Sequence, residues 1–367
     1  ACALTNFELG DLTDIQKDAI VQACNEIIDG KFHDQFIVDP IQGGAGTSTN
    51  MNANEVIANR ALEILGHPKS SYNIIHPNNH INMSQSTNDV YPTAIKLTLH
   101  ELIYKLKDAL RFLRDCFEEK AIEFKDVLKM GRTQLQDAVP MTLGQEFKTF
   151  AVMIDDDIYR LRNVQALLKE INLGATAIGT GINTKASYQR KVISNLREVT
   201  GVDYVSAGDL IEATQDTGSF VHISGMLKSV AIKISKICND LRLLSSGPRA
   251  GFNEINLPPL QPGSSIMPGK VNPVMPEVVN QVAFEVIGAD MTISMASEGG
   301  QLQLNVFEPL IAYKLFTSIN MMRRAFYSLG EKCIKGITAN EDVCMENILN
   351  SVTLVTCLNP IIGYEKC

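Results

Sequence analysis

Five long stretches of the chain carry apolar residues at alternating intervals of three and four, the spacing of a helix with one buried face. They cover residues 93 to about 123, a segment after Pro140, residues 220–244, and two segments that follow a Gly/Pro-rich loop ending at Pro273. Their apolar positions are, in order, Ile95, Leu99, Leu102, Leu106, Leu110, Leu113 and Phe117; Phe147, Ala151, Ile154, Ile158, Leu161 and Leu168; Phe220, Ile223, Leu227, Val230, Ile234, Ile237, Leu241 and Leu244; Val279, Val282, Val286, Ala289 and Ile293; and Leu310, Leu315, Ile319, Met322, Phe326 and Leu329. The pattern predicts helices of roughly 25 to 30 residues, or about 40 to 45 Å at 1.5 Å per residue.

A lone helix of this length cannot bury its apolar face. We therefore expect a mainly α fold, a long-helix bundle that subunit association extends. The pattern also predicts a shorter helix over residues 54–65 and allows short strands within 172–183 and near 202–205. The long stretches themselves show no sustained alternation of the kind that half-buried strands require.

Composition and charge narrow the classes of protein that fit this bundle. The 367 residues carry a formal net charge of −8 without a concentrated basic block, whereas nucleic-acid binders need a basic face to neutralise phosphates. No apolar run approaches the length of a membrane span. Cysteines are scattered without metal-ligand or redox spacing, at Cys2, Cys24, Cys116, Cys238, Cys333, Cys344, Cys357 and Cys367. These features predict a cytoplasmic protein with reduced thiols and no nucleic-acid or membrane partner.

Four clusters rich in Ser, Thr, Asn and Gln precede predicted helices, at residues 43–50, 84–89, 131–134 and 263–273. A single cluster of this kind is more often a helix cap than a binding site. Together, however, the clusters supply many neutral donors for a small anion, and Lys270 adds a fixed positive charge. The last cluster also mixes prolines with Gly263 and Gly269, which is typical of a mobile loop that closes over a substrate. The expected ligand is a small carboxylate.

The glycine-rich segments do not match nucleotide-binding motifs. Residues 43–49 lack the Gly-Lys-Ser/Thr ending of a P-loop, and Lys270 is followed by Val271. The glycine spacing of residues 174–181 differs from that of a dinucleotide-binding loop, and no βαβ pattern surrounds it. Pro77 separates His76 from His80, which disfavours a helical metal pair. The sequence therefore disfavours ATP, NAD and a metal centre.

Taken together, the motifs resemble those of the aspartase/fumarase superfamily over essentially the whole chain. GSSIMPGKVNP at 263–273 resembles the signature of that superfamily, and the likeness continues through Gly46-Thr47 and residues 84–89, 131–140 and 174–183. Within the superfamily the chain most resembles the aspartate ammonia-lyases, whose pattern is followed by QSTND at 85–89, GRTQLQDAVP at 131–140 and NPVMPE at 272–277. Fumarases commonly carry His where this chain has Gln134.

The resemblance implies a reaction and a role for each matched residue. The reaction is the reversible deamination of L-aspartate to fumarate and ammonia through an aci-carboxylate intermediate. Ser264 is the implied general base, and Lys270 the cation that favours its alkoxide. The implied ligands of the β-carboxylate are Thr47, Ser86, Thr87 and Ser265, those of the α-carboxylate are Thr133, Lys270 and Asn272, and Asn88 and Gln134 face the amino group. No organic cofactor is required, and activation by a divalent cation is not readable from the sequence.

The resemblance also implies a homotetramer whose multi-helix core is built from the long helices and whose active sites are composite. It divides the chain into a remnant of an N-terminal domain (1–87), a central domain of five long helices (88–342) and the start of a truncated C-terminal domain (343–367). If the first two long helices are antiparallel, residues 86–88 and 133–134 of one chain lie about 40 Å apart, so a site that uses both needs two chains. Fumarate hydratase and a non-catalytic structural relative are the alternatives, and an assay with aspartate against malate discriminates them.

Overall fold

The computed structural model describes residues 1–263 and 266–367. The chain forms two compact units. Unit 1 comprises Ala1–Leu102, Asn163–Gly225 and Ala289–Thr317, and unit 2 comprises Ile103–Arg162, Met226–Gly288 and Ser318–Cys367. Each long helix contributes one end to each unit. This division does not test the domain boundaries at residues 88 and 343, which stay predictions.

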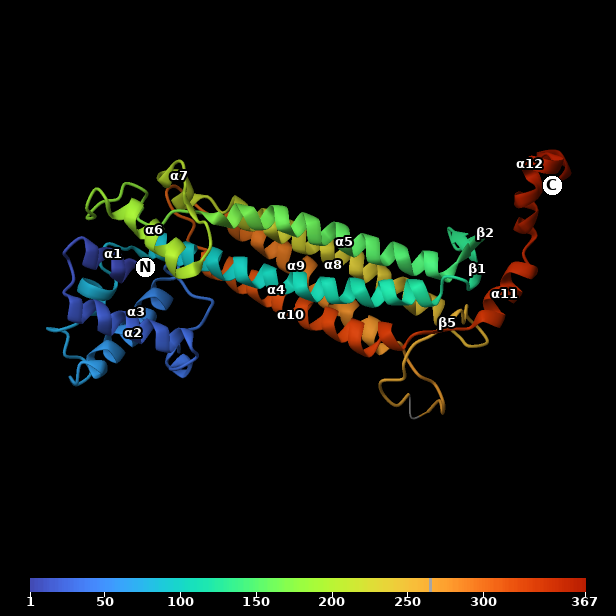
Figure 1. Ribbon diagram of the computed structural model, residues 1–367, viewed down its shortest axis with the longest axis horizontal. Helices are drawn as coiled ribbons and strands as arrows, with labels where there is room; N and C mark the ends of the chain where they lie inside the picture. The colour runs from blue at the N-terminus through green and yellow to red at the C-terminus, as the bar shows by residue number, and fades with distance from the viewer. Residues whose placement is uncertain (264–265) are drawn as a thin grey trace. The chain divides into compact units, whose positions relative to one another are not determined.

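The five predicted long helices are present. They are α4 (Thr87–Glu123), α5 (Leu143–Ala166), α8 (Gly218–Leu244), α9 (Val274–Glu298) and α10 (Glu308–Lys332). Within each unit their segments lie side by side (Figure 1), and predicted core residues such as Leu99, Phe117 and Leu315 are fully buried. Leu102 is only half-buried, while its neighbour Ile103 is buried completely. The prediction of a mainly α protein built from long helices is confirmed.

The first long helix begins at Thr87 rather than at the predicted residue 93. Pro92 lies inside it and has no N–H to donate to the carbonyl of Asn88, four residues earlier. That carbonyl instead accepts a hydrogen bond from Asn172 Nδ2 at 3.1 Å. Because a side chain from a distant segment supplies the missing donor, the helix extends through the proline.

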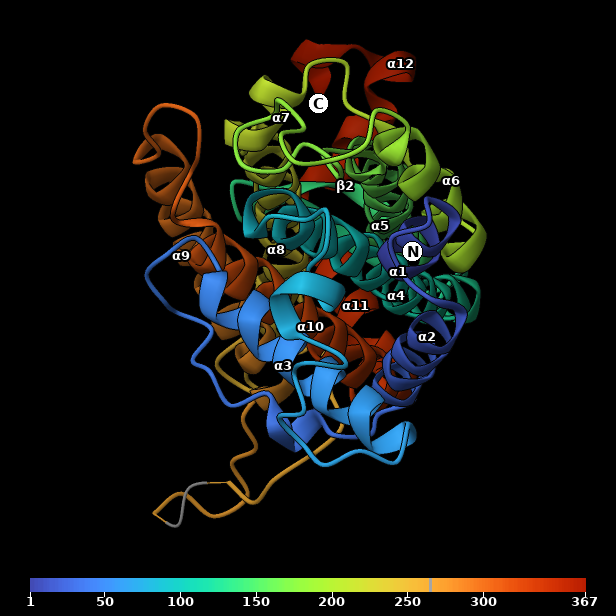
Figure 2. The ribbon, with the colours of Figure 1, turned by 90° about the vertical axis from the view of Figure 1, so that its left-hand side faces the viewer.

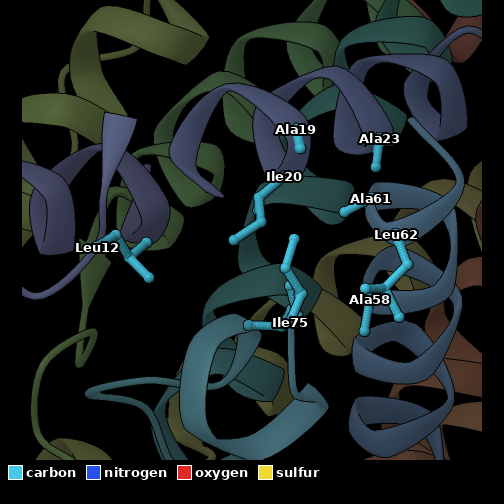
Figure 3. Close-up of a cluster of buried hydrophobic side chains, with 9 residues drawn as sticks. Leu12, Ala19, Ile20, Ala23, Ala58, Ala61, Leu62 and Ile75 are labelled. Atoms are coloured by element: carbon cyan, nitrogen blue, oxygen red, sulfur yellow. The ribbon is translucent and has the colours of Figure 1, made fainter. Parts of the chain in front are cut away.

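Unit 1 also holds shorter elements: α1 (Cys2–Glu8), α2 (Asp14–Ile28), α3 (Thr47–Ile64), α6 (Tyr188–Thr200), α7 (Leu210–Gln215) and the parallel pair β3 (Glu170–Ile171) and β4 (Val205–Ser206). Helix α1 packs against α2 and α6, and α2 packs against α3 (Figure 2). Small and branched side chains such as Ala19, Ile20, Ala58 and Leu62 fill the α2–α3 contact (Figure 3). This core holds the second half of α3 against α2.

In unit 1 the predicted start of one helix is wrong, and strands that the sequence allowed are absent from one segment. Helix α3 begins at Thr47, not at Asn54. Its first turn is polar and carries no apolar stripe, and Gln42 Oε1 accepts the otherwise unpaired N–H of Thr49 at 3.0 Å. Residues 172–183 contain no strand and form turns instead. The strand near 202–205 is present only as the two-residue β4.

The sequence analysis did not predict the longest strands of unit 2. A hairpin pairs β1 (Leu128–Thr133) with β2 (Gln136–Thr142) in antiparallel register, with Thr133 opposite Gln136. Its strands lack clean alternation, and β2 contains Pro140, so the pattern gave no strand signal. Unit 2 also contains the antiparallel pair β5 (Ile255–Asn256) and β6 (Thr338–Ala339), together with α11 (Glu341–Leu349), which packs on β1, and α12 (Asn359–Ile362).

The remaining helical elements are the π-helical segment η2 (Pro77–Ile81) and the short 3₁₀ helices η1 (His33–Gln35), η3 (Leu167–Lys169), η4 (Ile334–Gly336), η5 (Val352–Leu358) and η6 (Tyr364–Lys366). Among the described residues, no helix is both long enough and apolar enough to cross a membrane.

Candidate active site

Four of the expected substrate ligands lie in unit 1, at the starts of two helices. Thr47 is the first residue of α3, Thr87 and Asn88 open α4, and Ser86 directly precedes it. Asn50, in the first turn of α3, donates from Nδ2 to Thr87 Oγ1 at 2.9 Å and so joins the two helix starts. The polar clusters were predicted to precede these helices, but Thr47, Thr87 and Asn88 form their first turns.

The hydroxyl groups of Ser86 and Thr87 each accept a structural hydrogen bond. Ser86 Oγ accepts the backbone N–H of Asn88 at 3.2 Å, and Thr87 Oγ1 accepts Asn50 Nδ2. A hydroxyl that accepts such a bond still has its own hydrogen to donate. Both side chains are therefore suited to bind a carboxylate.

Thr47 differs from these two residues. Its Oγ1 donates to the carbonyl of Gly44 at 2.7 Å, so it can donate to a carboxylate only by giving up this bond. The preceding Gly46 has φ of 92° and lies against Tyr91, whose ring would be 2.6 Å from an added Cβ. Only glycine fits there, and this contact keeps the start of α3 against α4.

Asn88 is oriented by the segment that follows Asn172. Its Nδ2 donates to the carbonyl of Ala177 at 2.7 Å, while Asn172 Nδ2 holds its backbone carbonyl. With one amide hydrogen committed in this way, Asn88 Oδ1 is placed as an acceptor. An acceptor is the group needed to bind an ammonium.

Asp89 is a buried carboxylate that the sequence analysis did not single out. Its Oδ1 accepts the N–H of Ser86 at 2.9 Å, and its Oδ2 accepts the N–H groups of Gly174 and Thr176 at 3.0 Å each. Burial raises the pKa of Asp89 to about 6, against the opposing effect of these backbone donors. Asp89 therefore ties residues 86–88 to the 174–176 turn. The Ser-x-x-Asp spacing of a capping box was the available signal.

Thr133 and Gln134 lie in unit 2 at the tip of the β1–β2 hairpin. Gln134 and Leu135 form its two-residue turn, with φ of 52° and 63°, the left-handed pair of a type I′ turn. Both side chains are exposed. Such a turn normally favours Asn and Gly, and backbone strain of this kind is common at functional sites.

Lys270 and Asn272 lie in the segment that leads into α9. The Lys270 side chain is exposed. The backbone N–H of Lys270 donates to the carbonyl of Met267 at 3.2 Å and closes a turn. A cavity of about 710 Å³ lies beside this segment, lined among others by Arg242, Ser246, Asn256, Lys270 and Asn272. Ser264 and Ser265 lie outside the described residues, so the expected base stays a prediction.

Thr47, Ser86, Thr87 and Asn88 thus lie in unit 1, whereas Thr133, Gln134, Lys270 and Asn272 lie in unit 2. That residues of both sets bind one substrate in a composite site stays a prediction. In the part of the chain that the structure describes, no three His, Cys, Asp or Glu side chains are grouped so as to hold a metal ion.

Comparison with known proteins places these motifs. The family model described as Lyase matches residues 1–288. The aspartate ammonia-lyase of Helicobacter pylori (strain ATCC 700392 / 26695) is 61% identical over 366 residues, which cover 100% of this chain and 78% of that protein. The aspartate ammonia-lyase of Escherichia coli (strain K12) is 57% identical over 367 residues, which cover 100% and 77%.

Solved structures agree with this assignment. A fumarate lyase:delta crystallin from Brucella melitensis bound to cobalt has a TM-score of 0.97 and 55% identity, covering 100% of this chain and 79% of that one. A recombinant class II fumarase from Schistosoma mansoni has a TM-score of 0.95 and 36% identity, covering 100% and 80%. The resemblance to the aspartase/fumarase superfamily, and within it to the aspartate ammonia-lyases, is confirmed.

Proposed function

The chain belongs to the lyase family of the aspartase/fumarase superfamily, and from this premise we propose that it catalyses the reversible deamination of L-aspartate to fumarate and ammonia. The observation that carries the proposal is the identity with curated aspartate ammonia-lyases over the full chain, which exceeds the identity with the class II fumarase. The orientation of Asn88 supports an amine as the leaving group, because its Oδ1 can accept from an ammonium.

The proposed reaction begins with removal of a proton from the substrate's β-carbon by Ser264. The electron pair moves into the β-carboxylate and gives an aci-carboxylate, which carries one more negative charge than the ground state. Donors that meet this charge lower the barrier, and the Ser86 and Thr87 hydroxyl groups have hydrogens to offer. The C–N bond then breaks, ammonia leaves with its electron pair, and the double bond of fumarate forms.

The remaining roles follow the matched motif positions. Thr47 and Ser265 complete the β-carboxylate site, Thr133, Lys270 and Asn272 hold the α-carboxylate, and Gln134 joins Asn88 at the amino group. The positive charge of Lys270 both binds a carboxylate and favours the ionised form of Ser264. Proton transfer and C–N cleavage on this route need no organic cofactor, and the enzyme acts in the cytoplasm.

The active form is proposed to be a homotetramer with sites that combine segments of different chains. Supporting this, α9 carries exposed apolar residues at intervals of three and four, namely Phe284, Ile287, Met291 and Met295. Ile287 is 37% exposed and the other three are between 63% and 68% exposed. A stripe of this kind on a long helix fits packing against another helix. A second copy of the chain is the partner that a helical tetramer core requires.

Fumarate formation tests the proposed reaction directly. The intact protein is supplied with L-aspartate or L-malate at equal concentration, and fumarate is followed by its ultraviolet absorbance. The proposal predicts turnover with aspartate and little with malate. Faster turnover with malate would identify a fumarate hydratase, and turnover with neither would identify a non-catalytic relative. Ser264→Ala is expected to abolish the aspartate reaction while leaving thermal unfolding unchanged.

A further inference from the structure

Three asparagine amides connect α3 to the start of α4. Asn50 Nδ2 donates to Thr87 Oγ1 at 2.9 Å and to Asn82 Oδ1 at 3.2 Å. Asn54 Nδ2 donates to Asn50 Oδ1 at 3.3 Å and to the same Asn82 oxygen at 3.2 Å. The side chains of Asn54 and Thr87 are buried. Thr87 is therefore part of a polar network that these three asparagines form.

The orientation of the Asn50 amide is set by its neighbours. If it were turned by 180°, its oxygen would face Asn82 Oδ1 and its nitrogen would face Asn54 Nδ2, so two hydrogen bonds would become repulsive contacts. Asn82 is itself oriented, because its Nδ2 donates to the carbonyl of Gln85 at 3.4 Å. Asn50 consequently presents an N–H, not an oxygen, to Thr87.

This fixed donor determines what the Thr87 hydroxyl can do. Since Asn50 Nδ2 is a donor, the hydroxyl cannot give it a hydrogen. In residues 1–263 and 266–367 the structure holds no hydrogen bond donated by Thr87 Oγ1, although the side chain is only 8% exposed. A buried hydroxyl hydrogen without an acceptor is costly, which fits a group reserved for a ligand.

We propose that Asn50 is a positioning residue that fixes Thr87 as a hydrogen-bond donor to the substrate's carboxylate. The inference rests on the proposed function and deepens it: recognition of the carboxylate depends on an amide that does not touch the substrate. Because the network leaves Thr87 its hydrogen to donate, the site favours a carboxylate, which can only accept, over a ligand group that presents an N–H or O–H.

Two substitutions distinguish removal of the Asn50 donor from its replacement by an acceptor. Asn50→Ala frees the Thr87 hydroxyl to rotate and is expected to lower kcat/KM for aspartate about 5- to 10-fold, through both a higher KM and a lower kcat. Asn50→Asp puts an acceptor where the donor was, so Thr87 donates to the new carboxylate instead of the substrate. This variant is expected to lower kcat/KM by about 100-fold or more. Equal effects of Ala and Asp would overturn the proposal.

A double-mutant cycle with Thr87→Val shows whether Asn50 acts through Thr87. If it does, Asn50→Ala adds less than about a 2-fold effect once Val occupies position 87, because the hydroxyl that it orients is gone. Independent effects that multiply in the double variant would refute the proposal. Fumarate affinity, measured by calorimetry over the same four proteins, must follow the same pattern.

Asn195 provides a matched control in the same unit. Its Nδ2 donates to Thr5 Oγ1 at 2.9 Å, as Asn50 does to Thr87, and its side chain is buried among residues outside the expected site, whereas that of Asn50 is half-buried. Asn195→Ala should lower thermal stability as much as Asn50→Ala and leave KM unchanged. A comparable rise in KM in this control would assign the Asn50 effect to general loosening.

The calorimetric measurement separates this inference from the proposed function. A wild-type protein that binds fumarate without deaminating aspartate contradicts the proposed function alone, and the cycle in fumarate affinity still decides the role of Asn50. A protein that binds no fumarate contradicts both.

Discussion

Arg132 and Glu254 form an ion pair in which the carboxylate is completely buried. Arg132 Nη2 lies 2.6 Å from Glu254 Oε1, and Lys129 Nζ lies 2.8 Å from Glu254 Oε2. The contact of Lys129 with Oε2 is an ion pair that lacks the geometry of a hydrogen bond. The Lys129 side chain is 2% exposed and that of Glu254 is 0% exposed. Since Arg132 directly precedes Thr133 and Gln134, this cluster anchors the hairpin that carries two expected substrate ligands.

Removing this carboxylate is expected to destabilise unit 2 strongly. Glu254→Gln removes the carboxylate that pairs with Arg132 and leaves buried Lys129 with Glu146 alone. Breaking a buried ion pair typically costs about 3–5 kcal/mol. Urea unfolding of the intact protein measures it. Glu118→Gln is the control, because its ion pair with Lys148 is partly exposed, 33% at Glu118 and 53% at Lys148, and should contribute less than about 1 kcal/mol. Similar losses in both variants would contradict the anchoring role.

Asp89 is expected to position the substrate ligands beside it. Asp89→Asn places an amide N–H against the backbone donors of Ser86, Gly174 or Thr176, so residues 86–88 lose part of their support. We expect kcat/KM for aspartate to fall about 10- to 100-fold, measured by fumarate absorbance. Asp290→Asn, which alters a buried carboxylate bonded to Ser224, should leave kcat/KM near the wild-type value. The idea fails if the two variants lose activity equally.

Glu308 is expected to make stability depend on pH. Burial raises the pKa of this carboxyl from 4.5 to about 8, opposed by the charge of Lys96, and its Oε2 has no hydrogen-bond partner among the described residues. A raised pKa means that the neutral form suits the fold. Its contribution to stability is therefore complete below pH 4.5 and is lost as the pH rises through about 8.

Glu308→Gln should remove this dependence. At pH 8.5 the variant is expected to be more stable than wild type by about 1–3 kcal/mol, and at pH 4.5 the two should differ little. Denaturant unfolding at the two pH values tests this. The charge of Glu308 acts on the pKa of Lys96 and of Tyr91. Glu298 is exposed and lies on another helix, so Glu298→Gln is a suitable control and should leave the pH dependence of stability intact.

The exposed stripe on α9 is expected to be an assembly surface. Met291→Glu puts a charge in the middle of the stripe, and burying that charge between chains would be costly. Light scattering after size-exclusion chromatography should show smaller species than wild type. Ile28→Glu, at an isolated exposed position at the end of α2, should leave the mass unchanged. An unaltered mass for Met291→Glu would exclude the stripe from the interface.

Composite sites predict complementation between inactive chains. A Ser264→Ala chain and a Thr133→Ala chain, each inactive alone, should regain some activity after subunit exchange, because a hybrid oligomer contains sites built only from intact segments. The measurement is fumarate formation, with exchange confirmed by differently tagged chains. Confirmed exchange without any activity would place the residues of each site on a single chain.

Much of the fold could be predicted because helical periodicity is local. The three-and-four spacing identified every long helix and buried residues such as Leu99, Phe117 and Leu315. Prediction failed at helix starts with a polar first turn, so Thr47 and Thr87 were assigned to loops. It also missed the β1–β2 hairpin, whose strands are held by their pairing rather than by alternation. Lys270 and Asn272 were placed correctly just before α9.

The sequence by itself determined the helices, their apolar faces and the family to which the polar motifs belong, since these depend on neighbouring residues and on short patterns. Only the tertiary structure decided how the polar groups are used. The direction of the Thr87 hydroxyl depends on Asn50, and the two backbone donors that bind Asp89 Oδ2 come from more than 80 residues away. A hydrogen bond needs a donor and an acceptor within about 3 Å of each other, and folding alone brings such distant groups to that distance.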